Sequence, residues 1–328
     1  MNVLVTGGAG YIGSVTVEAL SAAGERVVVL DDLSRGHRVA VAQDIPFYEG
    51  DIGDDLLVRN IVTSHAITQV IHFAGLTSVP ESVGEPLRYF ENNTGKVMRL
   101  LTALTSCGVR NVVFSSTAAV YGEPEHTPID EEHRKKPTNP YGLSKYFVEQ
   151  ILDWMDSACE TTHVALRYFN AAGATATKGE DHRPETHLIP LILQVPMGKR
   201  AYVSLYGVDY PTPDGTCVRD YIHVADLADA HVRALRYLAD GGRSRKINLG
   251  NGKGFSVREV VVMAEQVTGT KIPVREEARR AGDPSVLIAE SEEARNVLGW
   301  SPRCSGLEDI VSSAWEWHRS HPEGYRQG

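Results

Sequence analysis

Apolar and polar positions along the first half of the chain alternate between two kinds of segment. Short, almost wholly apolar runs predict strands that are buried on both faces, as in a parallel sheet. Apolar residues three and four positions apart predict amphipathic helices. We expect strands at residues 1–6, 26–30, 46–49, 69–73 and 111–115, and helices at 14–23, 54–65, 82–107 and from Pro140 onward. Strands and helices in regular alternation indicate an α/β protein built on a Rossmann-type, doubly wound parallel sheet.

A glycine-rich turn, residues 7–13 (GGAGYIG), follows the first strand and opens the first helix. Backbone N–H groups in such a turn, together with the helix N-terminus, can bind a pyrophosphate. Asp31 ends the second strand, 18 residues after Gly13. Its carboxylate could accept a hydrogen bond from an adenosine ribose hydroxyl and would repel a 2′-phosphate, so NAD is favoured over NADP. Arg35 and Arg38 could serve a 2′-phosphate, but we interpret them as loop residues in solvent.

Tyr141 and Lys145 are four positions apart, so they fall on one face of the helix that is expected from Pro140. Asn139 suits the cap of that helix, and a proline is permitted in its first turn. A free tyrosine, with a pKa near ~10, is a poor base at neutral pH. An ammonium group one turn away favours the phenolate, and a cationic nicotinamide would favour it further. The pair could therefore remove a proton from a hydroxyl while hydride leaves the same carbon.

Ligands of a doubly wound sheet bind beyond the carboxyl ends of its strands. The loops after residues 6, 30, 73 and 115 should therefore gather on one edge. Thr117, in the last of these loops, would then bring a hydroxyl beside Tyr141. The alternative for Thr117 is a turn residue that satisfies its own backbone.

Charge and composition exclude several classes of protein. The chain has 33 Lys and Arg against 42 Asp and Glu, a net charge of −9, which argues against a nucleic-acid or membrane-surface protein. Its four cysteines are scattered, which indicates a reducing compartment without a disulfide framework. No leader pattern and no run of membrane-spanning length is present, so we expect a cytoplasmic protein. The twelve histidines include no H-x-x-x-H or His/Cys cluster; we interpret His182 and His187 as ordinary loop residues and expect no metal site.

Longer blocks of sequence carry a family resemblance. A resemblance to the extended short-chain dehydrogenase/reductase superfamily is carried by VTGGAGYIG, HFAGL, SSTAAVYG and YGLSK. The second half is similar to the UDP-galactose 4-epimerases, also called UDP-glucose 4-epimerases. The blocks that carry this similarity are RYFN (167–170), GEDHRPETHLIP (179–190), PDGTCVRDYIHV (213–224), RRAGD (279–283) and the tail at 315–325. The resemblance extends over essentially the whole chain.

The resemblance implies a homodimeric enzyme whose chain forms two domains. An NAD-binding Rossmann domain is expected at residues 1–170, and a smaller C-terminal α/β lobe that binds the UDP-sugar mainly at 171–328. Segments at about 215–245 should return to the first domain. Beyond about residue 171 the regular alternation does give way to loops and short elements, with helices expected at 225–239, 257–267 and 307–319.

The same resemblance implies roles for particular residues. The catalytic positions match Thr117, Tyr141 and Lys145. The cofactor-binding positions match Gly7, Gly10, Tyr11, Ile12, Gly13, Asp31, Asp51, Ile52, Phe73, Ala74, Gly75, Asn92, Tyr141, Lys145 and Phe169. The substrate-binding positions match Thr117, Asn170, Leu188, Tyr206, Arg219, Val257, Arg280 and Asp283. Two arginines could neutralise a diphosphate by forked hydrogen bonds, although spacing alone leaves surface salt bridges as the alternative.

Three positions depart from part of the family. Thr117 stands where some members have serine and keeps the hydroxyl. Thr77 stands where some members have a lysine near the cofactor, so one positive charge is missing. Leu287 occupies a position that is tyrosine in members restricted to unsubstituted hexoses and smaller in members that accept N-acetylated sugars. Leucine is intermediate in size, which leaves the acceptance of N-acetylated sugars open.

The activity implied by the resemblance is the interconversion of UDP-glucose and UDP-galactose in galactose metabolism, by inversion at C4 through a transient 4-keto sugar with tightly bound NAD. A UDP-N-acetylhexosamine or UDP-pentose 4-epimerase is an alternative. Nucleotide-sugar 4,6-dehydratases and decarboxylases need an acidic residue directly after the catalytic threonine, where this chain has Ala118 and Ala119. A non-catalytic NAD-sensing protein would not need Tyr141 and Lys145 together with the sugar-diphosphate residues.

Overall fold

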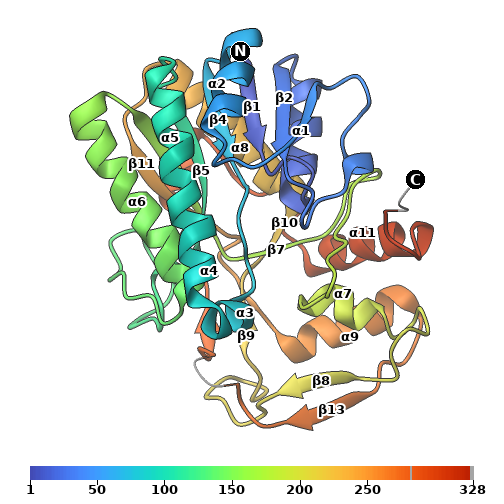
Figure 1. Cartoon of the computed structure of the whole chain (residues 1–328). Helices are drawn as coiled ribbons and strands as arrows, with labels where there is room; N and C mark the ends of the chain where they lie inside the picture. Colours follow the sequence, from blue (N-terminus) through green and yellow to red (C-terminus); the bar gives the residue numbers. More distant parts are fainter. Residues whose placement is uncertain (281–282, 326–328) are drawn as a thin grey trace.

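A seven-stranded parallel sheet forms the larger part of the molecule, in the order β11-β6-β5-β4-β1-β2-β3 (Figure 1). The computed structural model describes residues 1–280 and 283–325. The strand order reverses between β1 and β4, as in a Rossmann fold, so the expected α/β class is confirmed. The strands are β1 (Asn2–Thr6), β2 (Arg26–Asp31), β3 (Phe47–Glu49), β4 (Gln69–His72), β5 (Asn111–Thr117), β6 (Thr162–Tyr168) and β11 (Arg245–Leu249).

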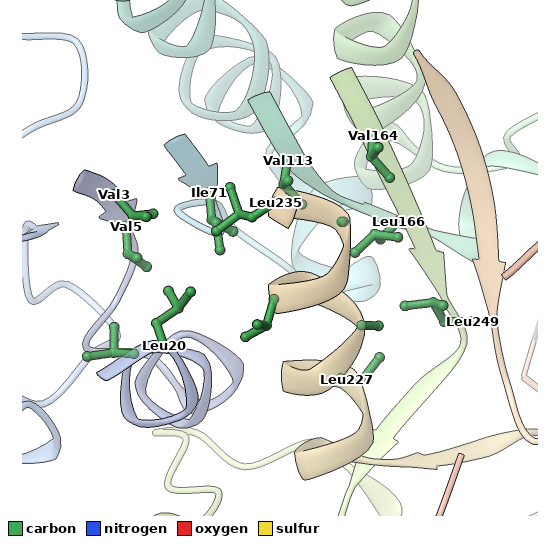
Figure 2. Packing of buried hydrophobic residues seen from close by; sticks show 14 of the residues in the cluster. Val3, Val5, Leu20, Ile71, Val113, Val164, Leu166, Leu227, Leu235 and Leu249 are labelled. Atoms are coloured by element: carbon green, nitrogen blue, oxygen red, sulfur yellow. The ribbon is translucent and has the colours of Figure 1, made fainter. Parts of the chain in front are cut away.

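Each face of this sheet has its own apolar core, because successive strand residues point to opposite faces. Val3 and Val5 of β1 pack with residues of α1 and α8, and Figure 2 shows this side of the sheet. Leu4 packs on the other face with residues of α2, α5 and α6. Helices therefore cover both faces, which explains why the central residues of these strands are mostly apolar. These helices are α1 (Tyr11–Ala22), α2 (Asp55–Ser64), α5 (Lys96–Ser106), α6 (Pro140–Cys159) and α8 (Val224–Ala239).

The long helical region expected over about residues 82–107 is present, but it is divided into several elements. The chain forms α3 (Val79–Gly84), α4 (Pro86–Phe90), a π-helical turn (Glu91–Gly95) and then α5. Pro86 explains the first break, because proline disfavours helical backbone in the preceding residue, and Glu85 adopts φ −128° and ψ 58°. The π-helical turn carries Asn92 and Asn93, and such turns occur frequently at functional sites.

Beyond β6 the chain builds a smaller lobe with a separate apolar core between α7, α9 and α11 (Figure 1). The chain then returns to the large sheet through α8 and β11, which pairs with β6. The helices expected at 225–239, 257–267 and 307–319 are α8, α9 and α11, each within one residue of the expected bounds. The remaining elements are β7 (Asn170–Ala172), α7 (Leu188–Leu193), β8 (Val203–Tyr206), β9 (Val218–Arg219), β10 (Tyr221–His223), β12 (Phe255–Ser256), α9 (Val257–Thr268), β13 (Val274–Glu277), β14 (Val286–Leu287), α10 (Glu292–Leu298) and α11 (Leu307–Ser320).

None of the helices in the described part of the chain combines the length and the apolar character needed to cross a membrane. The boundary between the two domains at residue 170 stays a prediction. Ala281 and Gly282 of the RRAGD block lie outside the described residues, as do residues 326–328 at the end of the expected lobe.

Candidate active site

The glycine-rich turn between β1 and α1 forms a cradle without side chains. Gly7 has φ +73°, and a Cβ atom there would lie 2.4 Å from the backbone nitrogen of Ala74. A Cβ atom on Gly13 would lie 2.2 Å from the Gly7 carbonyl oxygen. Gly10 caps α1 without any side-chain hydrogen bond, so the first N–H groups of the helix are available to a ligand. An uncapped helix N-terminus behind a turn this tight fits the pyrophosphate of a dinucleotide.

Asp31 lies at the end of β2 and faces this turn. Its Oδ2 accepts a hydrogen bond from the Ala9 N–H at 2.9 Å, and its Oδ1 accepts one from the Leu33 N–H at 2.9 Å. Burial raises the pKa of the carboxyl, and the two backbone hydrogen bonds offset part of that rise. Each carboxylate oxygen keeps a second lone pair, so Asp31 can still accept from a ribose hydroxyl as the sequence predicts.

Arg35 and Arg38 both have other partners. The Arg35 guanidinium donates to the Glu81 carboxylate at 3.1 Å and to the Arg183 carbonyl at 3.2 Å. Arg38 donates to the Val41 carbonyl at 2.9 Å and lies 4.5 Å from the centre of the Phe47 ring. Both arginines therefore have protein partners in addition to the solvent that the sequence predicts for them. Asp31 remains the charged side chain that contacts the glycine-rich turn.

The start of α6 agrees with its expected cap. The Asn139 side chain accepts a hydrogen bond from the Gly142 N–H at 2.8 Å, and Pro140 is the first helical residue. A Cβ atom on Gly142 would lie 2.5 Å from the Ala119 carbonyl oxygen. Glycine therefore lets the first turn of α6 approach the loop after β5, and this approach brings Tyr141 to that loop.

Thr117 and Tyr141 meet at this point. Burial raises the pKa of the Tyr141 phenol, and a hydrogen bond with the Thr117 hydroxyl lowers it in part. The Thr117 oxygen also accepts a hydrogen bond from the Ala119 N–H at 3.1 Å, so both interpretations of this residue hold. In the absence of a cationic ligand the phenol is protonated at neutral pH, and a nearby positive charge is needed to favour the phenolate.

Lys145 supplies a positive charge one turn further along α6. Its side chain is buried, its Nζ donates to the Ser115 carbonyl at 3.1 Å, and it lies 5.0 Å from the centre of the Phe114 ring. A Cβ atom on Gly75 would lie 3.3 Å from this Nζ, so the loop after β4 is also adjacent. Burial lowers the pKa of the Lys145 ammonium to about 8. The loops after β4 and β5 therefore converge on the Tyr141/Lys145 helix.

Asn93 was not assigned a role from the sequence, yet it ties these parts together. Its Nδ2 donates to the Leu76 carbonyl at 2.9 Å and to the Ser144 hydroxyl at 3.2 Å, and its Oδ1 accepts from the Leu76 N–H at 2.9 Å. The side chain is buried. Asn93 therefore joins the π-helical turn, the loop after β4 and α6. The only signal in the sequence was its position directly after Asn92, a residue that the resemblance places against the cofactor.

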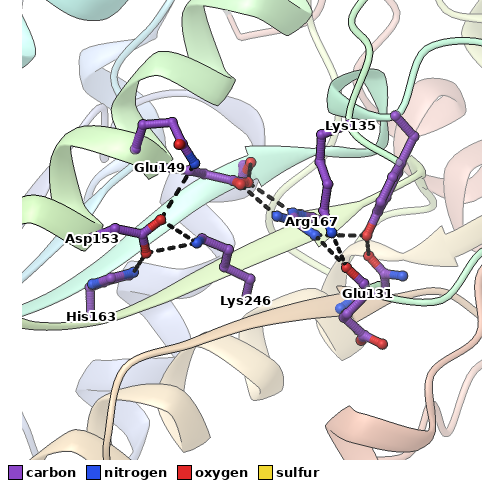
Figure 3. A network of polar contacts seen from close by, with 11 residues as sticks. Glu131, Lys135, Glu149, Asp153, His163, Arg167 and Lys246 are labelled. Carbon is purple, nitrogen blue, oxygen red and sulfur yellow. Dashed lines mark hydrogen bonds and ion pairs between the residues drawn. The ribbon is translucent and has the colours of Figure 1, made fainter. Parts of the chain in front are cut away.

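A buried ion pair holds α6 against the sheet (Figure 3). The Glu149 carboxylate accepts two hydrogen bonds from the Arg167 guanidinium, at 2.9 and 2.6 Å, and a third from the Ser116 hydroxyl at 2.5 Å. Arg167 also donates to the Tyr121 hydroxyl at 2.9 Å. Glu149 lies one turn beyond Lys145 on the same helix, so this network fixes Tyr141 and Lys145 relative to β5 and β6.

Four of the expected substrate residues form two contacting pairs in the smaller lobe, whereas Thr117 ends β5 of the large sheet. Arg219 of β9 forms an ion pair with Asp283, and Leu287 of β14 is its register partner. The Arg280 guanidinium lies 3.8 Å from the centre of the Tyr206 ring at the end of β8. The other three begin short elements: Asn170 begins β7, Leu188 begins α7 and Val257 begins α9.

The remaining positions implied by the resemblance have these surroundings. Ile12 lies in the first turn of α1, and Asp51 and Ile52 follow β3, where Asp51 forms an ion pair with Lys96. The Asn92 side chain donates a hydrogen bond to that of Asn93. Phe73, Ala74 and Thr77 follow β4, and the Phe73 ring packs on that of His231 with ring centres 4.6 Å apart. Phe169 and Leu287 both pack against the small apolar cluster that contains Ala118. Leu287 is also the register partner of Arg219, so it lies between this cluster and β9 of the smaller lobe.

His182 and His187 are not isolated loop residues. With Glu180 and Glu185 they form a cluster whose nitrogen and carboxylate atoms lie within 4.8 Å of one another. The sequence does contain the signal, three acids and two histidines within eight residues, but it does not match the H-x-x-x-H spacing that was sought.

Comparisons with known proteins agree with this geometry. A family model described as the NAD dependent epimerase/dehydratase family matches residues 3–250. The chain belongs to this family. A UDP-glucose 4-epimerase from Lacticaseibacillus casei is 53% identical over 327 residues, which cover 99% of each chain. A crystal structure of a UDP-glucose 4-epimerase has a TM-score of 0.98 and 46% identity and covers 100% of each chain. The enzyme of that name from Bifidobacterium longum, in complex with NAD+ and UDP, has a TM-score of 0.93 and 38% identity, and covers 99% of this chain and 100% of its own.

Proposed function

We propose that this family member is an NAD-dependent UDP-glucose/UDP-galactose 4-epimerase, an isomerase that inverts C4 of the hexose. The observation that carries the proposal is the meeting of Tyr141 and Thr117 at the carboxyl edge of the sheet, with Lys145 one turn away. The same edge carries the glycine cradle and Asp31. The full-length similarity to UDP-glucose 4-epimerases supports the assignment of the substrate.

NAD fits the cradle between β1 and α1, where no side chain obstructs the uncapped helix N-terminus. Gly10, Tyr11 and Ile12 would hold its pyrophosphate, and Asp31 its adenosine ribose. When bound, NAD accepts a hydride from C4 of the sugar and later returns it, so the reaction needs no external oxidant.

Tyr141 is the proposed proton acceptor. Its phenolate takes the proton of the sugar 4-hydroxyl, and the phenol later returns a proton to the oxygen of the inverted centre. The Lys145 ammonium, one turn along α6, would favour the phenolate, and the Thr117 hydroxyl beside Tyr141 lowers the pKa of the phenol in part. Because the same pair removes and returns the proton, one site serves both directions of the reaction.

The smaller lobe is proposed to hold the nucleotide part of the substrate. Arg219 is mostly buried and paired with Asp283, so its guanidinium is preorganised beside β9. Arg280, stacked on Tyr206, would supply the second positive charge for the diphosphate. Leu188 begins α7 and would contact the uridine part. This arrangement grips the nucleotide and leaves the hexose to present either face of C4.

The test is incubation of purified, untagged protein with UDP-galactose without added NAD, followed by chromatographic separation of the UDP-sugars. The expected product is UDP-glucose, and the same equilibrium mixture should be reached from UDP-galactose and from UDP-glucose. UDP-N-acetylgalactosamine and UDP-arabinose are run in parallel, because Leu287 leaves sugar size open. Protein that carries NAD but leaves UDP-galactose unchanged would refute the proposal.

We also propose a cytoplasmic homodimer. Leu87 of α4 and Trp154 of α6 are 80% and 76% exposed, and Phe147, seven residues before Trp154, packs on Phe90 of α4. Apolar side chains on two adjacent helices form a surface that a second copy could cover. The four cysteines are all free, which suits a reducing compartment. Sedimentation equilibrium should give twice the chain mass, and a monomer at micromolar concentration would contradict the homodimer.

A further inference from the structure

Four side chains with nitrogen and oxygen donors converge on the segment between β7 and α7. Glu180 Oε1 lies 3.1 Å from His182 Nδ1 and 2.7 Å from His187 Nδ1. The same His187 nitrogen lies 3.0 Å from Glu185 Oε1. All four donor groups fall within 4.8 Å of one another, although they belong to a loop of only eight residues.

The surroundings hold these donors in place. Glu185 Oε1 accepts hydrogen bonds from the N–H groups of Thr186 at 2.7 Å and His187 at 2.8 Å. Glu180 is buried, with 5% of its side chain exposed, and within residues 1–280 and 283–325 its carboxylate has only the two imidazoles as hydrogen-bonding partners. A buried carboxylate beside a second carboxylate is unfavourable unless positive charge compensates both.

We propose that Glu180, His182, Glu185 and His187 form a structural binding site for Zn²⁺ or a chemically similar divalent transition-metal ion. Two imidazole nitrogens and two carboxylate oxygens are a complete tetrahedral ligand set for zinc. Zinc bonds of about 2.0–2.2 Å place ligand atoms about 3.3 Å apart, so the closest pairs need to open by only about 0.6 Å or less. Mg²⁺ and Ca²⁺ prefer all-oxygen sites, so imidazole ligands argue against them.

An ion has access to this site from solvent. A groove of about 760 Å³ is lined by Glu180, His182 and Glu185 together with residues of α11 and the tail that follows it. His187 is 45% exposed at its side chain. The site is therefore open to metal exchange on the side of His187, whereas Glu180 is the buried ligand on the opposite side.

The ion would fix the segment that joins the two lobes. His187 is the cap residue of α7, which begins at Leu188, and the ring of His182 meets that of Tyr11 edge to face with centres 6.4 Å apart. The Tyr11 hydroxyl donates to the Gly173 carbonyl at 2.5 Å. A bound ion thus joins the first turn of α1 to the start of α7. Metal binding at this cluster does not depend on the proposed function.

Metal content is the primary test, because it does not depend on activity. Untagged protein is stripped with EDTA, dialysed against Zn²⁺ and analysed by mass spectrometry of the metal, with calorimetric titration of Zn²⁺ into the stripped protein. We expect one Zn²⁺ per chain. Co²⁺ in its place should give the intense visible absorption of a tetrahedral site, and Mg²⁺ should not compete. Less than about 0.2 Zn²⁺ per chain would overturn the proposal and leave a proton-sharing cluster as the explanation.

Variants locate the ion. His187→Gln, at an exposed position, and Glu180→Gln should each weaken Zn²⁺ binding by at least about 10-fold, and far-UV circular dichroism checks that they fold. His126→Gln is the matched control, because His126 lies beside His133 with ring centres 4.4 Å apart and outside this cluster. The control should bind Zn²⁺ as the wild type does. Unchanged Zn²⁺ stoichiometry and affinity in His187→Gln would place the ion elsewhere and refute the assignment. An equal loss of Zn²⁺ affinity in His126→Gln would also refute it.

Discussion

Removing the charge of Glu149 should destabilise the protein more than almost any other single polar substitution. Glu149 and Arg167 have side chains that are 0% and 1% exposed, and Glu149 accepts three hydrogen bonds. In Glu149→Gln the guanidinium stays buried without its counter-charge. Breaking a buried ion pair in this way costs about 3–5 kcal/mol. That is a large part of the roughly 5–15 kcal/mol by which a typical protein is stable.

The measurement is equilibrium unfolding in urea, followed by circular dichroism at a fixed pH and NAD concentration. Replacement of both partners, Glu149→Met with Arg167→Met, should cost less than either single substitution. The double variant leaves no buried charge, and apolar groups of similar volume can replace a buried pair with little loss. Asp55→Asn, which breaks the exposed pair between Asp55 and Arg59, is the control and should leave the unfolding midpoint almost unchanged.

A specific pattern would contradict this reasoning. If Glu149→Gln shifts the midpoint no more than Asp55→Asn does, the buried pair is not what holds α6 against the sheet. If the double variant is as unstable as Glu149→Gln, the loss comes from packing and not from an unpaired charge. Only a large single effect with recovery in the double variant fits the network in Figure 3.

Three further predictions concern the catalytic edge of the sheet. Tyr141→Phe should lower turnover by ~10²–10⁴-fold while UDP binding, measured by calorimetry, is retained; near-normal turnover would transfer the role of base to Thr117. Turnover should fall as the pH rises through about 8, because Lys145 then loses the charge that favours the phenolate. Lys145→Arg stays charged, so its turnover should not show this alkaline decrease. An unchanged alkaline decrease in that variant would exclude Lys145 as its cause. Mass analysis of the cofactor released from denatured protein should show NAD, and Asp31→Asn should raise the affinity for NADP relative to NAD; wild-type protein that releases mainly NADP would contradict the role of Asp31.

The parts of the fold that the sequence predicts are those set by local patterns. β1, β2, β4 and β5 begin where their apolar runs begin or within one residue, because strands buried on both faces have a nearly continuous apolar centre. The start of α6 follows from two adjacent residues, Asn139 and Pro140, that act on the backbone next to them. The glycine turn is predicted for the same reason: its requirement for small residues is local.

Contacts between distant residues could not be predicted in this way. Arg167 and Glu149 are 18 residues apart, and Arg219 and Asp283 are 64 apart. Each is an ordinary charged residue until the fold removes it from solvent. The break at Pro86 was missed for a different reason, because the apolar spacing of residues 82–107 continues across it. Family resemblance supplied the roles of Arg219 and Asp283, but only the structure shows that they are paired.

The residues after Thr117 help to distinguish epimerisation from the other reactions that this scaffold could perform. Elimination of water or loss of carbon dioxide from an oxidised sugar needs a second acid or base beside the proton acceptor. Ala118 and Ala119 instead follow Thr117, and the Ala119 carbonyl is closely approached by Gly142. The buried Ala118 belongs to an apolar cluster against which Leu287 and Phe169 pack. Ala118 and Ala119 therefore offer no second acid or base beside Tyr141. In the proposed function a single proton acceptor is enough, because the reaction removes one proton from the 4-hydroxyl oxygen and later restores it.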